Sequence, residues 1–278
     1  MPITNSEFPI TNSQLLITNQ LINYTLHLAD NTLILAQQNS EWCGHGPILE
    51  QDIAITNISL DLLGQARNFY QYAAELINQS TSQPINLLTS QPATEDTLAY
   101  LRDNREFRNC LLVEQENGDW AKTILRQFVF SNYQYLLYEK MQDSKDEALR
   151  AIAEKALKEV IYHLKWSSEW VIRLGDGTEE SNQRINKAVI ELWPYVDELF
   201  INAAYESALI SNNISVDVAS LKNLWMQKTK EIFAEATLGI PENIFAHKGG
   251  KQGMHTERLG YILAEMQFLQ RAYPNSVW

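Results

Sequence analysis

The histidines of this chain, and the acidic residues near them, are the side chains best suited to metal chemistry. Di-iron proteins built on helical bundles use Glu-x-x-His pairs, because residues three apart on a helix share one face. None of the five histidines has a Glu three positions before it. Glu159 and His163, four apart, come nearest to the pattern. Asp61 is followed three residues later by Gly64, where a His would be required.

One such pair cannot supply the roughly six protein ligands of a di-iron centre. We therefore predict that this chain holds no metal. Glu159 and His163 are expected to form a buried or half-buried pair that satisfies its own hydrogen bonds. Asp30 and Asp61 are interpreted as remains of a polar centre that has lost its ligands.

Nucleophilic chemistry has even less support in the sequence. The chain contains no Gly-x-Ser-x-Gly elbow, no Walker phosphate loop and no His-Glu-x-x-His motif. Cys43 and His45 stand two residues apart in the segment 41–47, which also contains two glycines and Pro47. This composition predicts a tight connection between helices, closed by Trp42, in preference to thiol catalysis.

Three arginines, Arg102, Arg105 and Arg108, recur at three-residue spacing beside Phe107. On a helical turn they would form one cationic ridge, which suits phosphate groups because arginine binds them through paired hydrogen bonds. The alternative is a set of surface salt bridges with the acidic residues interleaved among them.

A second basic segment runs from His247 to His255 and contains three glycines and two lysines. It precedes a helix that Thr256 would open, so it could present backbone N–H groups and positive charge to an anion. It could equally be a loop that contacts a partner protein.

The elements that must position these residues are helical, because apolar residues recur at helical spacing and strand-like alternation is weak. Asp119 is a predicted N-cap, Ser144 and Glu147 form a predicted capping box, and Pro194 is expected to break a helix. The sequence therefore predicts an all-α bundle. The expected helices are 23–38, 48–77, 119–141, 144–174, 182–211, 217–238 and 256–272.

Two segments fall outside this helical pattern. Residues 1–19 repeat Ile-Thr-Asn three times and are predicted to be a disordered tail. Residues 77–97 contain Thr-Ser-Gln-Pro twice and are predicted to be an inserted surface loop. The remainder, 20–278, is predicted to be a single domain.

Composition excludes several classes of protein. The 278 residues include 34 acidic and 22 basic side chains, which give a net charge of −12. This balance argues against nucleic-acid binding, which requires clustered cations. No apolar run reaches the ~18 residues of a membrane span, and the N-terminus lacks the pattern of a signal peptide. We expect a cytoplasmic protein that contacts no membrane.

Several motifs resemble one family closely: Glu41–Pro47, Asn57–Asn68, Leu111–Gln115, Leu174–Thr178 and Gly249–Glu257. Over residues 21–278 the chain resembles the PaaC subunits of multicomponent ring 1,2-phenylacetyl-CoA epoxidases. The resemblance implies a ferritin-like four-helix bundle with additional C-terminal helices. It also implies a structural subunit whose metal ligands have been lost, in a complex that epoxidises the ring of phenylacetyl-CoA.

The same resemblance implies partners and cofactors. The partners are a catalytic subunit of PaaA type that holds the di-iron centre, a small bridging subunit of PaaB type and a reductase of PaaE type. The reductase carries FAD and an iron–sulfur centre and uses NADPH, and no cofactor is expected in this chain. The competing hypotheses are a stand-alone ferritin-like di-iron oxidoreductase and a free acyl-CoA-binding module.

The resemblance also carries over two substrate-contacting stretches by position. The expected coenzyme A contacts are Glu106, Phe107, Arg108, Asn109, Ser207, Ala208 and Leu209, with Arg102 and Arg105 as possible phosphate contacts. Glu106, Arg108 and Ser207 differ from the family's usual residues.

Overall fold

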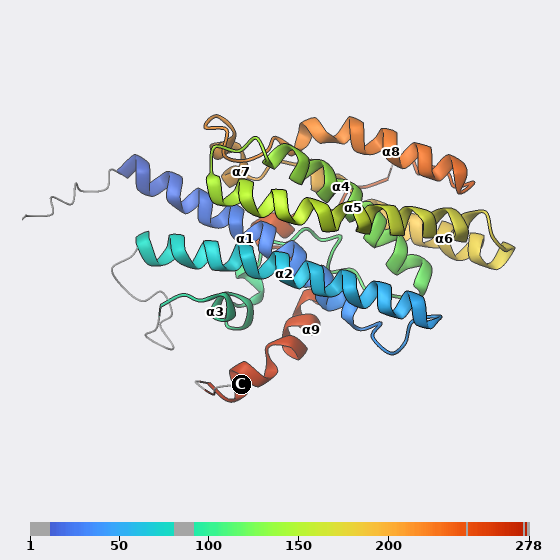
Figure 1. Ribbon diagram of the computed structural model, residues 1–278, viewed down its shortest axis with the longest axis horizontal. Helices are drawn as coiled ribbons and strands as arrows, with labels where there is room; N and C mark the ends of the chain where they lie inside the picture. The colour runs from blue at the N-terminus through green and yellow to red at the C-terminus, as the bar shows by residue number, and fades with distance from the viewer. Residues whose placement is uncertain (1–11, 81–91, 243, 275, 277–278) are drawn as a thin grey trace, which may run out of the picture.

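The computed structural model describes residues 12–80, 92–242, 244–274 and 276, and within these ranges every regular element is helical. Four helices are long and run along the longest axis of the molecule (Figure 1). These long helices are α1 (Asn12–Ser40), α2 (Leu49–Ser80), α4 (Trp120–Met141) and α5 (Glu147–Gly175). The prediction of an all-α fold built on four long helices is confirmed.

The shorter helices cover this bundle or extend from it. They are α3 (Glu95–Tyr100), α6 (Glu179–Leu192), α7 (Ala204–Ile210), α8 (Lys222–Glu235), α9 (Glu257–Met266) and α10 (Phe268–Ala272). In the described part of the chain, five 3₁₀ turns lie between these helices: η1 (Asn104–Glu106), η2 (Trp193–Tyr195), η3 (Asp197–Phe200), η4 (Val218–Leu221) and η5 (Gly250–Gln252). Figure 1 shows α8 along one side of the bundle and α9 projecting from the opposite side, near the C-terminus.

The core forms where α1 packs along α2 and α4 packs along α5. α4 is buried over nearly its whole length, because α5, α6 and α8 also pack against it. Its polar side chains are therefore internal and bind neighbouring elements. Asn132, for example, donates hydrogen bonds to the carbonyl of Trp225 and the hydroxyl of Thr229 on α8.

The connection between α1 and α2 is the tight turn that residues 41–47 predict. Gly44 has a φ of 81°, which only glycine adopts without strain. Trp42 packs edge-on against Trp120, and its indole donates to the hydroxyl of Thr123 at 2.9 Å. The imidazole of His45 contacts the carbonyl oxygen of Cys43, so no thiol–imidazole pair forms there.

Several predicted boundaries require correction. α1 begins at Asn12, so residues 12–19 of the expected tail are helical, as extending a formed helix costs far less than starting one. Residues 1–11 lie outside the described residues. In the expected loop 77–97, α2 continues to Ser80 and α3 begins at Glu95, while 81–91 are not described.

The predicted helix signals have mixed outcomes. Asp119 is the N-cap of α4, as expected. Pro194 breaks the expected helix 182–211, which divides into α6, two 3₁₀ turns and α7. The capping box at Ser144 is wrong: Asp146 caps α5 by accepting the N–H of Leu149 at 2.9 Å, and Ser144 instead binds the carbonyl of residue 214.

Candidate functional site

Arg102 lies inside the protein and does not face solvent. Its guanidinium forms an ion pair with Asp30 of α1, and the two side chains are 9% and 0% exposed. Its Cζ atom also lies 4.2 Å from the centre of the Phe107 ring. The prediction that Arg102 contacts phosphate is therefore wrong, because both its charge and its donors are already used.

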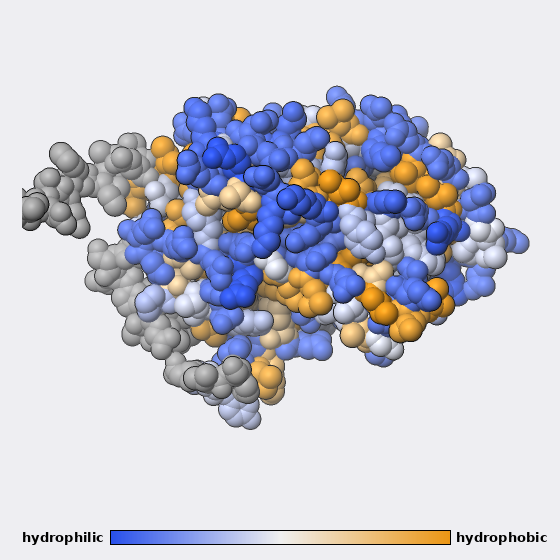
Figure 2. All heavy atoms as spheres, viewed as in Figure 1, coloured by the Kyte–Doolittle hydropathy of each residue, from blue (hydrophilic) through white to orange (hydrophobic). Residues whose placement is uncertain are grey.

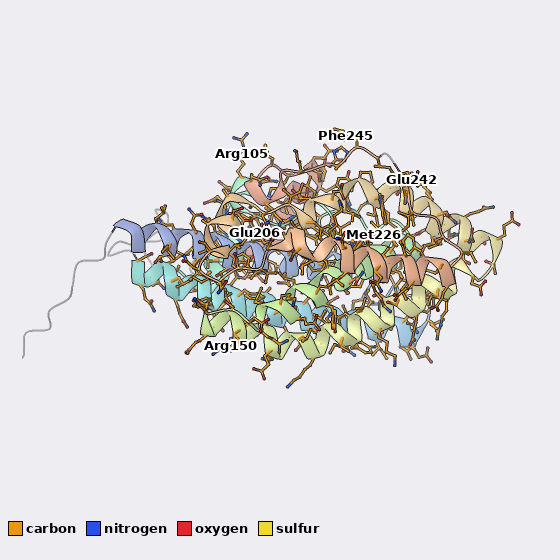
Figure 3. All side chains as sticks on the ribbon, turned by 90° about the horizontal axis from the view of Figure 1, so that it is seen from above. Arg105, Arg150, Glu206, Met226, Glu242 and Phe245 are labelled. Carbon is orange, nitrogen blue, oxygen red and sulfur yellow. The ribbon has the colours of Figure 1, made fainter. Side chains whose placement is uncertain are left out.

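The three arginines do not form one ridge, because α3 ends at Tyr100 and the chain after it is irregular. Arg105 is exposed on η1. Arg108 is half-buried, and its Nε donates to Asn23 of α1 at 3.0 Å. Figure 3 shows Arg105 at the outer edge of the molecule, on the side opposite Arg150.

The alternative of salt bridges within the arginine cluster is also wrong. Asp103 pairs with Arg271 of α10, with 2.9 Å between the charged atoms. The Glu106 carboxylate accepts the backbone N–H of Asp103 at 2.6 Å and so closes the turn of η1. Neither acidic side chain forms a salt bridge with an arginine of the cluster, because the expected helical turn does not exist.

The first expected substrate-contacting stretch divides into outward and inward side chains. Glu106 is exposed and Arg108 is half-buried, whereas Phe107 and Asn109 are both fully buried. The amide of Asn109 donates to the carboxylate of Glu114 at 2.9 Å. Only the side chains of residues 106 and 108 are open to a ligand.

The second stretch lies on α7, close to the first. Ser207 and Ala208 are exposed, and Leu209 is fully buried. The guanidinium of Arg108 lies 5.9 Å from the ring centre of Tyr205, two residues before Ser207. The fold therefore brings together two stretches that are about a hundred residues apart in the sequence.

The side chains interpreted as remains of a metal site form hydrogen bonds and ion pairs with other residues. They are Asp30, Asp61, Glu159 and His163. The imidazole Nε2 of His163 lies 3.0 Å from the carboxylate of Asp61. Glu159 accepts a hydrogen bond from Gln65 at 2.9 Å, and Gln65 in turn accepts one from Gln134 at 2.9 Å. The predicted Glu159–His163 pair is wrong, because two residues of α2 one turn apart reach across to two residues of α5 one turn apart.

These acidic positions do not fit a di-iron group. Asp30 is neutralised by Arg102, while Asp61, Glu159 and His163 are paired along the contact of α2 with α5. Across the described residues, no three His, Cys, Asp or Glu side chains come close enough to share a metal ion. As they are paired here, these side chains do not provide a site for a catalytic metal.

The anionic groups bound by the basic segment 247–255 are carboxylates of the protein itself. The backbone N–H groups of Gly249 and Gly250 donate to the carboxylate of Glu198 at 2.7 and 2.8 Å. Lys251 is 1% exposed and forms an ion pair with Glu206 at 2.9 Å. This segment is thus bound into the interior, and only part of it faces solvent.

The pKa values of two histidines with buried side chains in this region are shifted in opposite directions. Burial and the nearby charge of Lys251 lower the pKa of His27 to about 4. Burial also opposes charge on His255, but hydrogen bonding and the charge of Glu114 outweigh it and raise the pKa of His255. The geometry agrees, because both ring nitrogens of His255 face acceptors, the Glu114 carboxylate at 2.8 Å and the Phe107 carbonyl at 2.9 Å.

Glu114 and His255 lie in sequence motifs named above, but the sequence did not indicate that they meet in the interior, near the buried Glu198 and Glu206. Glu198 and Glu206 belong to no motif that the sequence analysis identified. The available signal was the pair of glycines ahead of Lys251, since adjacent glycines permit close backbone approach.

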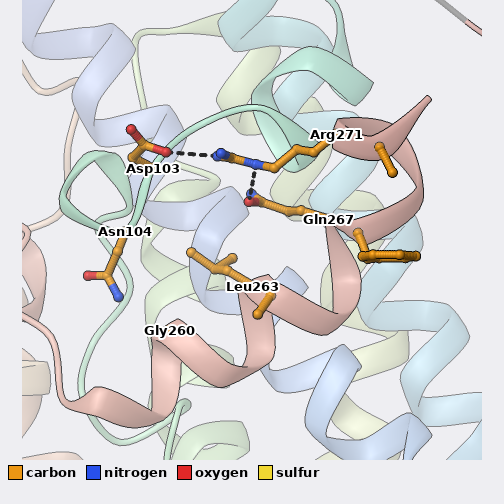
Figure 4. Close-up of a pocket in the computed structure, with 9 residues that line it drawn as sticks. Asp103, Asn104, Gly260, Leu263, Gln267 and Arg271 are labelled. Carbon is orange, nitrogen blue, oxygen red and sulfur yellow. Dashed lines mark hydrogen bonds and ion pairs between the residues drawn. The ribbon is translucent and has the colours of Figure 1, made fainter. Parts of the chain in front are cut away.

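A cavity of about 490 Å³ lies beside η1, between Asp103 and Asn104 on one wall and α9 and α10 on the other (Figure 4). Its lining is largely apolar, from Leu263 and Phe268 among others. Asp103 and Arg271, which form an ion pair with each other, both line it. None of the expected substrate-contacting residues lines this cavity.

No helix among the described residues has the length and apolar character needed to cross a membrane. The family model described as "Phenylacetic acid catabolic protein" matches residues 9–278, so the chain belongs to that family. The chain is also 47% identical over 247 residues to the C subunit of the 1,2-phenylacetyl-CoA epoxidase of Escherichia coli (strain K12). The match covers 88% of this chain and 93% of that protein.

Proposed function

We propose that this chain is a non-catalytic structural subunit of a cytoplasmic, multicomponent phenylacetyl-CoA epoxidase. In this proposal it supports a di-iron catalytic subunit and contributes to the site for the coenzyme A thioester. The name of the Escherichia coli relative supports the assignment to such a complex. The observation that carries the structural role is the pairing of Asp61 with His163 and of Glu159 with Gln65, which consumes the side chains a metal would need.

The proposed complex supplies the chemistry that this chain lacks. Its catalytic subunit, of PaaA type, would hold the di-iron centre that activates oxygen. A reductase of PaaE type would deliver electrons from NADPH through FAD and an iron–sulfur centre, and a small subunit of PaaB type would bridge the assembly. This chain would contact the catalytic subunit and phenylacetyl-CoA.

An apolar stripe on α2 supports the proposal that a partner protein packs on this helix. Leu49, Ile53, Leu60 and Leu63 are 72%, 50%, 60% and 37% exposed. Their spacing of four, seven and three residues places them along one side of the helix. Exposed apolar residues aligned in this way are typical of contacts between subunits.

Helix α5 continues this apolar surface, with Ile161 and Tyr162 51% and 47% exposed. Figure 2 shows the side of the molecule that carries α2 and α5, where apolar patches interrupt a hydrophilic surface. Helices α2 and α5 pack against each other, so the two sets of side chains belong to one region.

The contact with the coenzyme A thioester would centre on Arg108. Asn23 and the ring of Tyr205 hold its guanidinium at a half-buried position, next to the exposed Ser207 and Ala208. A held guanidinium suits a phosphate or diphosphate group because less side-chain entropy is lost on binding. Arg105 is the nearby exposed cation that could add a second contact.

The test is phenylacetyl-CoA binding to the complex assembled by co-expression with the catalytic subunit. We expect Arg108→Gln to raise the dissociation constant about tenfold, the equivalent of one charge-assisted hydrogen bond. Arg150→Gln is the matched control, because Arg150 is exposed on the side of the molecule opposite Arg105 (Figure 3). Unchanged binding by the Arg108 variant would remove this chain from the substrate site.

A further inference from the structure

The backbone of residues 107–111 is largely buried, yet it belongs to no helix and pairs with no described strand. Buried N–H and C=O groups need partners, and an irregular segment cannot obtain them from a regular ladder. Side chains from distant parts of the chain supply them here. These specific contacts fix the segment in one position.

Helix α1 holds one side of this segment through three polar residues on about one turn. Their contacts with the segment are His27 Nδ1 to the carbonyl of residue 108 at 2.7 Å, Asp30 to the N–H of residue 108 at 2.8 Å, and Asn31 to the N–H of residue 110 at 2.8 Å. All three side chains are buried. The α1 contacts therefore set the segment's distance from the bundle.

Residues 249–256, here called the strap, hold the other side. Glu198 accepts the N–H of Leu111 at 2.7 Å through one oxygen and the N–H groups of Gly249 and Gly250 through the other. His255 lies 2.9 Å from the carbonyl of Phe107. One carboxylate and one imidazole thus connect the strap to both ends of the segment.

The strap also approaches the segment, and η1 just before it, too closely for any side chain to intervene. A Cβ added at Gly250 would lie 2.3 Å from the carbonyl oxygen of Asn109. A Cβ at Gly253 would lie 2.3 Å from the carbonyl oxygen of Arg105. Both positions require glycine because backbone packs directly on backbone.

We propose that His255 and Gly250 are positioning residues for the substrate contact: the strap fixes the backbone of residues 106–109 so that Arg108 is aimed at the acyl-CoA ligand. This inference rests on the proposed function, in which Arg108 binds that ligand. Neither positioning residue touches the ligand. Their effect passes through the buried backbone, where a shift of about 1 Å at a positioned group can cost a large factor in binding.

The experiment uses the assembled complex and measures KM and kcat for phenylacetyl-CoA together with amide hydrogen exchange in residues 108–111. The variants are His255→Gln and Gly250→Ala. Their controls are His247→Gln, at an exposed histidine just before the strap, and Gly239→Ala, where an added Cβ meets nothing within 4 Å. Arg108→Gln is measured alongside to test the proposed contact itself.

We expect the two strap variants to raise KM about tenfold and to speed exchange of the segment's amides, with kcat within about twofold of the unmodified complex. A purely structural role would instead lower the active fraction, and so the apparent kcat, and leave KM unchanged. The two control variants should match the unmodified complex in every measurement.

Three results would overturn the proposal in distinguishable ways. If KM is unchanged in the strap variants but raised by Arg108→Gln, the strap does not position the contact and the proposed function stands. If Arg108→Gln also leaves KM unchanged, the proposed substrate contact fails as well. If Gly250→Ala does not assemble, His255→Gln carries the test, and failure of both to assemble would show that the strap serves folding alone.

Discussion

Asp30 and Arg102 form a buried ion pair that joins α1 to the irregular chain after α3. The hydroxyl of Tyr70 donates to the same carboxylate at 2.6 Å, and the N–H of Arg108 donates to it at 2.8 Å. The pair therefore stabilises the backbone next to the proposed substrate contact. A charge pair in this position is costly to break, because either partner left alone is a buried, uncompensated charge.

We expect Asp30→Asn to lower the free energy of unfolding by about 3–5 kcal/mol, since Arg102 would remain charged in the interior. Asp96→Asn is the matched control, because Asp96 is exposed on α3. Urea unfolding followed by circular dichroism measures both. Equal midpoints for the two variants would contradict the account of the ion pair.

The stability of this chain should fall in mild acid because of His27. Its pKa is about 4 in the folded protein and 6.5 in the unfolded chain, so the unfolded state takes up the proton first as the pH falls. The stability that the neutral ring contributes is complete above pH 6.5 and is lost as the pH falls towards 4. This linkage amounts to about 3 kcal/mol over that range.

The measurement is unfolding free energy against pH for the unmodified protein and for His27→Gln. The variant should lack the His27 share of the acid loss, because glutamine does not titrate. His45→Gln, at an exposed histidine, should keep the full slope. Parallel curves for all three proteins would contradict the buried neutral state of His27.

Gln51 binds two members of a cluster of four tryptophans. Its side-chain oxygen accepts the indole N–H groups of Trp166 and Trp170 at 3.0 and 2.7 Å. Trp120 packs edge-on against both rings and against Trp42. We therefore expect Gln51 to order the cluster that closes the turn between α1 and α2.

We expect Gln51→Ala to destabilise the protein by about 1–3 kcal/mol, since two partly buried donors lose their shared acceptor. The near-ultraviolet circular dichroism of the tryptophans should weaken at the same time. Gln183→Ala, on the exposed side of α6, should change neither. An unaltered spectrum in the Gln51 variant would show that packing alone orders the rings.

The apolar stripe on α2 predicts an effect on assembly without an effect on folding. Leu60→Glu should weaken association with the catalytic subunit by at least about tenfold, because it places an unpaired charge in the proposed contact. Ile190→Glu, at a residue 65% exposed on α6, is the control. Size-exclusion chromatography of the co-expressed chains gives the result, and equal complex formation by the two variants would move the contact elsewhere.

The helices could be predicted from the sequence because apolar periodicity, the Asp119 cap and the Pro194 break are local signals. The pairing of polar residues could not. Asp30 and Arg102 are 72 positions apart, and nothing local indicates that they meet in the interior. Three-residue spacing suggested one face for the arginines, but that inference holds only if the segment is helical.

The candidate site shows the same division between local and distant information. Absence of Glu-x-x-His is local and could be read directly from the sequence. The partners that Asp61 and Glu159 found instead lie across a helix contact, and the role of residues 249–256 depends on Glu198, some fifty residues earlier. These contacts could not be predicted from the sequence, because the residues that form them are far apart along the chain.

Under the proposed function, this chain keeps the helical scaffold of an oxygen-activating protein and leaves the metal to its partner. The most direct measurement is the iron content of this chain purified alone, compared with that of the complex obtained by co-expression with the catalytic subunit. The account predicts no stoichiometric iron in the isolated chain and about two irons for each catalytic subunit in the complex. Two irons bound per isolated chain, with oxygen-dependent activity, would contradict it.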